Sequence, residues 1–75
     1  MILTFRNSAK EERVIGDFET ERDAMLAMKK FCEERNFTIH YYNIHAIGNR
    51  RLYDVGSWSE FFYLEFPSEE DAKLD

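Results

Sequence analysis

The aromatic segment Tyr53–Phe66 places the strongest limit on what this chain can fold into. It predicts two β-strands joined by the tight turn Gly56–Ser59, because runs rich in aromatic residues flank a short polar stretch. The second strand carries aromatic side chains at successive positions, and therefore on both faces of a sheet. A half-buried strand needs apolar side chains on one face only, so the surplus rings must be covered elsewhere in the molecule or by a partner.

One helix is predicted to begin after Thr20 and to end at Arg35. Thr20 is a suitable N-cap, and Glu21 and Asp23 place negative charge in the first turn. Asn36 can adopt the left-handed conformation that ends a helix. At 100° per residue the apolar positions form one stripe about 160° wide. The stripe consists of Ala24, Met25, Ala27, Met28, Phe31 and Cys32.

Two hairpins complete the expected fold. The first pairs a strand at Ile2–Phe5 with one at Arg13–Phe18, and the second pairs Thr38–Ile47 with Arg50–Val55. With the strand of Tyr53–Phe66 added, the order along the chain is β-β-α-β-β-β. This order predicts an α+β fold: a single antiparallel sheet of about four to five strands with one α-helix packed on one face. Residues 1–66 form this domain, and residues 67–75 form an acidic C-terminal tail or a short frayed helix.

The turns set the pairing of the later strands. Glycine at the first position of the Gly48-Asn49 loop suits a type II′ turn, which opposes Ile47 to Arg50. The side chains then expected on the core face are Tyr42, Ile44, Ala46, Tyr53 and Val55.

The loop before the last strand leaves two registers open. A four-residue loop opposes Tyr53 to Phe62 and turns Phe62, Leu64 and Phe66 toward the helix. Phe61 and Tyr63 then lie on the outer face with His45 and Leu52. A five-residue loop exchanges the two sets, yet it still leaves aromatic rings outside.

The charge distribution argues against direct binding of nucleic acid. The net charge is −5, and residues 60–75 alone hold six acidic side chains and one basic one. The rest of the chain is neutral, so it offers no basic footprint for phosphates. No apolar run approaches the ~20 residues of a membrane span, and no signal peptide precedes the first strand. We therefore expect a cytoplasmic protein that does not contact a membrane.

The residues that could carry chemistry do not form a recognisable set. His40 and His45 lie on opposite faces of the expected strand, and Cys32 lies on the buried stripe of the helix, so we predict no metal site. A buried cysteine behaves as a small hydrophobe, and no Gly-rich loop or nucleophile elbow is present. We predict no cofactor, no catalytic residue and no enzymatic activity.

Two resemblances bear on function. Phe61, Tyr63, Leu64 and Phe66 resemble the third strand of an RNA-recognition motif, but Ser59, Glu60 and Phe62 depart from that pattern. The segment Asp54–Leu64 resembles a stretch in small uncharacterised proteins encoded by phages and prophages. That resemblance implies an accessory or inhibitor protein that works in the cytoplasm of a bacterial host.

The sequence therefore predicts a small non-catalytic protein-interaction module. The expected contact residues are Trp58, Phe61, Tyr63 and Leu52, together with Leu26 on the charged side of the helix, which is either an exposed side chain or a contact in a homodimer or complex. A second hypothesis is an acidic inhibitor of a nucleic-acid-binding host defence protein, acting through Glu69–Asp71. An RNA-binding module and a small enzyme without a recognisable site are two weaker hypotheses.

Overall fold

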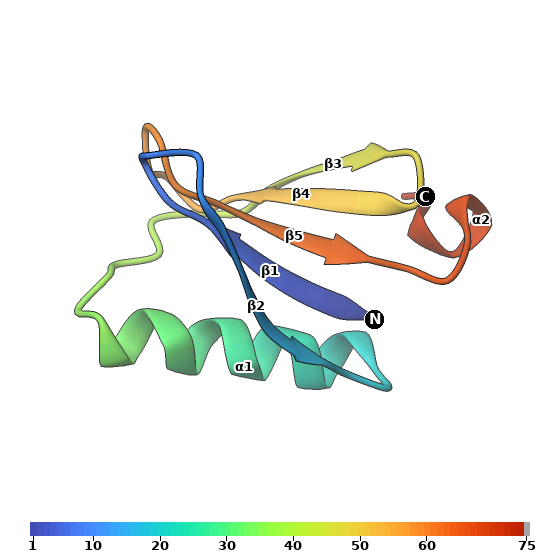
Figure 1. The fold of residues 1–75 in the computed structure, drawn as a ribbon, viewed down its shortest axis with the longest axis horizontal. Coiled ribbons are helices and arrows are strands. Elements are labelled where there is room, and N and C mark those ends of the chain that lie inside the picture. Colours follow the sequence, from blue (N-terminus) through green and yellow to red (C-terminus); the bar gives the residue numbers. More distant parts are fainter. Residues whose placement is uncertain (75) are drawn as a thin grey trace.

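A computed structural model describes residues 1–74 and contains one five-stranded antiparallel sheet with a long helix on one face (Figure 1). The strands are β1 (Ile2–Arg6), β2 (Glu12–Asp17), β3 (Asn43–Ile47), β4 (Arg50–Asp54) and β5 (Phe61–Glu65). The helices are α1 (Glu21–Glu34) and α2 (Glu69–Ala72). The spatial order of the strands is β2-β1-β5-β4-β3, which confirms the predicted α+β class and places β5 at the centre.

The helix α1 has the limits and the buried side that its sequence predicts. The Thr20 hydroxyl accepts a hydrogen bond from the Asp23 backbone at 3.1 Å. At the other end Asn36 has φ +55°, and the following Phe37 N–H donates to the Cys32 carbonyl at 2.8 Å. The fully buried side chains of α1 are Ala24, Met28 and Cys32, all from the predicted stripe.

The register predicted across the Gly48-Asn49 turn is confirmed, and the structure selects one of the two registers left open for β5. Ile47 opposes Arg50 across the Gly48-Asn49 turn, where Gly48 has φ +60°. Tyr53 opposes Phe62, so the four-residue-loop register holds. Phe62, Leu64 and Phe66 consequently lie in the core beneath the helix.

A cluster of aromatic rings joins α1 to the two central strands. The ring of Phe5 on β1 lies 4.9 Å from that of Phe31 on α1 and 5.2 Å from that of Phe62 on β5. Phe31 and Phe62 meet edge to face at 5.8 Å. Aromatic pairs in these geometries add to the free energy of burial. The helix is therefore fixed over β1 and β5 rather than over the whole sheet.

The start of β3 and the exposure of its side chains differ from the prediction. The strand begins at Asn43, and residues 37–42 form an irregular segment held at His40, whose N–H donates to the Val55 carbonyl at 3.1 Å. Ile44 and Ala46 do lie on the core face, but both are exposed, as is Tyr42. They are uncovered because α1 packs against β1 and its two neighbours, β2 and β5, far from β3 at the edge of the sheet (Figure 1).

Arg51 was not singled out by the sequence, yet it ties both helices to the sheet. It points to the core face of β4 and is 9% exposed. Its guanidinium donates to the Glu21 carboxylate at 2.8 Å and to the Ala72 carbonyl at 2.9 Å. It also stacks over Phe66, with 4.4 Å from the guanidinium carbon to the ring centroid. The C-terminal segment thus packs against the body through Arg51.

The predicted C-terminal tail contains the one-turn helix α2. The Ser68 hydroxyl caps it by accepting from the Asp71 N–H at 3.3 Å. Ala72 is fully buried. The rest of the tail to Leu74 is exposed, and Asp75 lies outside the described residues. This segment is therefore short but packed at one point.

Substitutions at adjacent positions of β5 should differ sharply in cost. Phe62→Ala removes a ring that is 1% exposed, so we expect a loss of about 3–5 kcal/mol of unfolding free energy. Tyr63→Ala acts on the open face and should cost about 1–2 kcal/mol. Denaturant melts of the two variants measure the difference. Equal losses would contradict the assignment of the two faces.

The role of Arg51 can be separated from that of its neighbour. Arg51→Ala removes the ion pair with the Glu21 carboxylate and the hydrogen bond to the Ala72 carbonyl that holds α2, so we expect a loss of about 2–4 kcal/mol. Arg50→Ala removes surface ion pairs with Glu12 and Glu65 and should cost about 1 kcal/mol or less. Similar melting curves for the two variants would show that α2 is not held by Arg51.

Candidate partner-binding surface

The central strands carry three of the predicted contact residues to one side of the sheet. Leu52 on β4 pairs directly with Tyr63 on β5, and Phe61 lies two residues from Tyr63 on the same face. This is the open face, opposite α1, and all three side chains are partly exposed. The alternation of β5, with Phe62 and Leu64 in the core, is the local reason for their position.

Trp58 stands at the tip of the loop between β4 and β5, and its side chain is 100% exposed. The loop is braced from within. The Asp54 carboxylate accepts from the Gly56 N–H at 3.0 Å, and the Ser57 hydroxyl accepts from the Glu60 N–H at 3.2 Å. These bonds order the backbone on both sides of Trp58 before any partner arrives.

Gly56 is required at this loop for two reasons. Its φ of +95° is disfavoured for residues with a side chain. A Cβ at this position would also lie 2.9 Å from the Cβ of His40. The close approach holds the irregular segment 37–42 against the loop, and so brings Tyr41 beside Trp58.

An open hollow of about 340 Å³ lies between these two segments. It is lined by Tyr41, Asp54, Gly56, Ser57, Trp58 and Phe61. The structure therefore brings two of the predicted contact residues, Trp58 and Phe61, together with Tyr41, which the sequence did not single out. Tyr41 could have been identified only from the packing of its neighbour His40 against Gly56, and that packing is seen only in the folded chain.

Tyr63 is less available than Phe61 or Trp58. Arg6 donates to its hydroxyl at 3.1 Å, and the Arg50 guanidinium stacks over its ring at 4.8 Å. Arg50 in turn lies 3.4 Å from the Glu12 carboxylate and 3.8 Å from that of Glu65. The centre of the open face is thus a network of charged and aromatic groups with balanced charge.

Leu26 is not part of this surface. It lies on α1 with 57% exposure, and α1 covers the opposite face of the sheet. No element brings Leu26 to Leu52, Phe61 or Tyr63. A single exposed leucine is common on folded chains, and a contact through Leu26 with a second copy or another partner stays a separate prediction.

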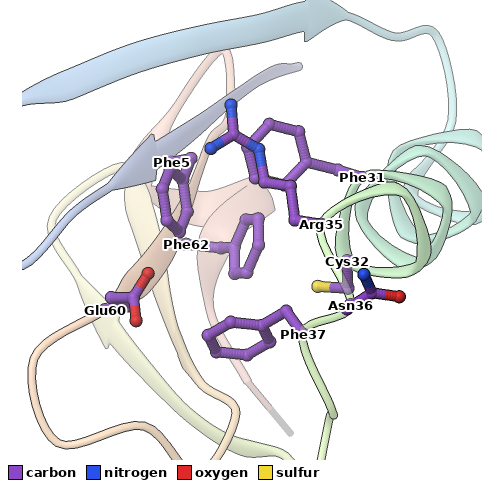
Figure 2. A pocket seen from close by; sticks show the side chains of 8 residues that line it. All are labelled: Phe5, Phe31, Cys32, Arg35, Asn36, Phe37, Glu60 and Phe62. Carbon is purple, nitrogen blue, oxygen red and sulfur yellow. The ribbon is translucent and has the colours of Figure 1, made fainter.

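A second cavity, of about 300 Å³, lies between the end of α1 and the sheet (Figure 2). Phe5, Phe31, Phe37 and Phe62 form its walls, and Arg35 closes one side by stacking 4.3 Å above the Phe31 ring. The Cys32 sulfur points into this cavity (Figure 2). Burial raises the pKa of the Cys32 thiol, and the charges of Glu33 and Glu60 raise it further. A thiol with a raised pKa stays protonated at neutral pH, which makes it a poor nucleophile.

The three residues considered as metal ligands are far from forming a site. Cys32 lies in the core, His40 packs beside Gly56, and His45 lies on the open face of β3. Within residues 1–74, no group of three or more His, Cys, Asp or Glu side chains is placed to hold a metal ion. In the same part of the chain, neither helix is long and apolar enough to cross a membrane.

Comparison of the chain with known protein families, with curated proteins and with solved structures found no match.

The Tyr53 hydroxyl and the Cys32 thiol, which can lose a proton at alkaline pH, predict how the stability of the fold depends on pH in that range. Burial raises the pKa of Tyr53 above its ordinary 10.0, as it raises that of Cys32 above 9.0. Because the unfolded chain then releases these protons first, the unfolding free energy should fall as pH rises above about 9. Denaturant melts between about pH 8 and about pH 11 measure the slope. Tyr53→Phe and Cys32→Ala should each flatten it, and an unchanged slope in both would contradict the assignment.

Proposed function

We propose that this chain is a small protein-interaction module that acts by binding, without catalysis. The observation that carries the proposal is the fully exposed Trp58 on a loop that its own hydrogen bonds hold in place. A large aromatic side chain in water is costly unless a partner covers it, and aromatic anchors dominate the energetics of interfaces.

The partner surface extends from Trp58 along the open face. The hollow between Trp58, Tyr41 and Phe61 is of a size to accept one or two apolar side chains of another protein. Leu52 and the edge of Tyr63 continue the surface toward the centre of the sheet. Burying about 150–250 Å² of tryptophan at ~25 cal/mol per Å² corresponds to roughly 4–6 kcal/mol before the costs of association.

Charge on the open face supports a protein over RNA as the partner. Arg50 is balanced by Glu12 and Glu65, and Asp54 adds a further negative charge beside the hollow. A face that binds RNA by base stacking needs unbalanced positive charge around the aromatic rings. In line with the resemblance of Asp54–Leu64, we propose that the module is an accessory or inhibitor protein of a phage in the bacterial cytoplasm.

The test compares capture of a bacterial partner by matched variants. Trp58→Ser and Phe61→Ser should each weaken binding by about 30-fold or more, equivalent to ~2 kcal/mol for an interface anchor. Leu26→Ser, an equally apolar exposed position on α1, should bind as the unmodified chain does. Thermal melts of all three variants confirm that folding is retained.

Salt dependence distinguishes an acidic inhibitor from an aromatic docking module. Glu69 lies beside the turn between β3 and β4. Its carboxylate is 3.6 Å from the position that a Cβ at Gly48 would occupy. An acidic inhibitor would lose capture steeply as the salt concentration rises, and would lose it in Glu69→Gln and Glu70→Gln. If those results are found while substitutions at Trp58 and Phe61 leave capture unchanged, the acidic inhibitor replaces the proposal.

A further inference from the structure

The edge strand β3 is the least protected part of the sheet. All five of its residues are exposed, and it forms one outer edge of the sheet. Its sequence Asn-Ile-His-Ala-Ile contains no lysine, glutamate or proline. Edge strands that must remain unpaired are normally blunted by such residues or by a bulge. Nothing of this kind protects β3.

The free backbone groups of β3 belong to Ile44 and Ala46. In a two-residue hairpin the closing pair, Ile47 and Arg50, exchanges both hydrogen bonds, and the pattern then alternates along the strands. Asn43, His45 and Ile47 consequently face β4, while the N–H and C=O groups of Ile44 and Ala46 point outward. Within residues 1–74, no hydrogen bond outside the ladder with β4 involves residues 43–47. These groups are available to another strand.

The other edge of the sheet is protected by contrast. β2 carries Glu12, Arg13 and Asp17, and its register with β1 shifts between Leu3 and Thr4. This irregularity leaves one residue of β2 without a partner and bends the edge. Charges and a bulge are the usual means of preventing edge pairing. The two edges therefore differ, and only β3 is suited to receive a strand.

We propose that β3 pairs antiparallel with β3 of a second copy of this chain, joining the two sheets into one. The two-fold axis passes through His45, so that His45 opposes its counterpart and Ile44 opposes Ala46 of the second copy. This register uses the outward groups of Ile44 and Ala46 on both chains and pairs the whole of β3. A symmetric contact of this kind is self-complementary.

Charge favours a second copy in this orientation. The chain carries a net charge of −5, and like-charged copies can approach most easily where acidic groups are absent, as they are on β3. The acidic first turn of α2 lies beside the turn that ends β3. Antiparallel pairing places the two α2 helices at opposite ends of the joined strands, whereas parallel pairing would put them side by side.

The exposed side chains of β3 gain cover in this dimer. Ile44 and Ala46 lie on the part of the core face that α1 does not cover. Pairing brings Ile44 of each copy against Ala46 of the other. A single pair of five-residue strands is a small interface, and interfaces below about 1,200 Å² are typically weak. We therefore expect a dimer that forms in the micromolar range and depends on concentration.

Disulfide trapping tests the register. Opposed residues at a non-hydrogen-bonded site have Cα atoms about 4.5 Å apart, which a disulfide can span. His45→Cys should therefore form a covalent dimer under mild oxidation with copper phenanthroline. Asn43→Cys should not, because in this register its copies lie about 13 Å apart. The unmodified chain is the control, since its Cys32 is 2% exposed.

A backbone variant tests the interface without a cross-link. Ala46→Pro removes an outward N–H that the monomer does not use, so it should melt like the unmodified chain. It loses half of the hydrogen bonds between the copies and should weaken the dimer by about tenfold or more in sedimentation experiments. Ala46→Ser keeps the N–H and should dimerise normally. The proposal is overturned if the unmodified chain is monomeric at all concentrations and His45→Cys forms no covalent dimer. It is also overturned if Asn43→Cys forms as much covalent dimer as His45→Cys.

Discussion

A single helix must cover the apolar face of five strands, and the rest of the structure follows from this constraint. A helix is about 10 Å wide, which matches about two spacings between neighbouring strands. The contacts of Phe31 with Phe5 and Phe62 fix α1 over β1 and β5. The strand farthest from α1 on the other side, β3, receives no cover, although its side chains on that face are apolar.

Arg51 completes the core face beside the first turn of α1. Its position on β4 would suit an apolar side chain, yet a guanidinium there reaches Glu21 on α1 and the carbonyl of Ala72 at the end of α2. Its stem and planar head also cover Phe66. One buried cation therefore closes the core with a helix too short to be stable by itself.

The two proposed contacts use different parts of the molecule. The partner surface lies on the loop of Trp58 and the open face, while self-association uses the edge of β3. In the dimer the two-fold axis places the Trp58 loops at opposite ends of the joined sheet, with both open faces on the same side. Two such sites on one rigid sheet could engage a partner that is itself repeated, which strengthens binding without a new contact.

The sequence by itself determined the local features of this protein. The limits of α1 at Thr20 and Asn36 and the turn at Gly48-Asn49 follow from rules that act over a few residues, whereas the loop before β5 left two registers open. Alternation along β5 separated Phe61 and Tyr63 from Phe62 and Leu64, but the folded chain decided which pair lies on the outer face. The limits of α1 and the Gly48-Asn49 turn were predictable because neighbouring residues decide them.

Only the tertiary structure decided the rest. The pairing of β1 with β5 joins residues far apart in the chain, and no local rule specifies it. That pairing sets where α1 lies, and so decides that Ile44 and Ala46 are exposed and that Arg51 is buried. The packing of His40 against Gly56 in the folded chain brings Tyr41 to the hollow beside Trp58. The alternation along a strand decides which residues share a face of the sheet. Whether that face is covered depends on elements that are distant in the sequence.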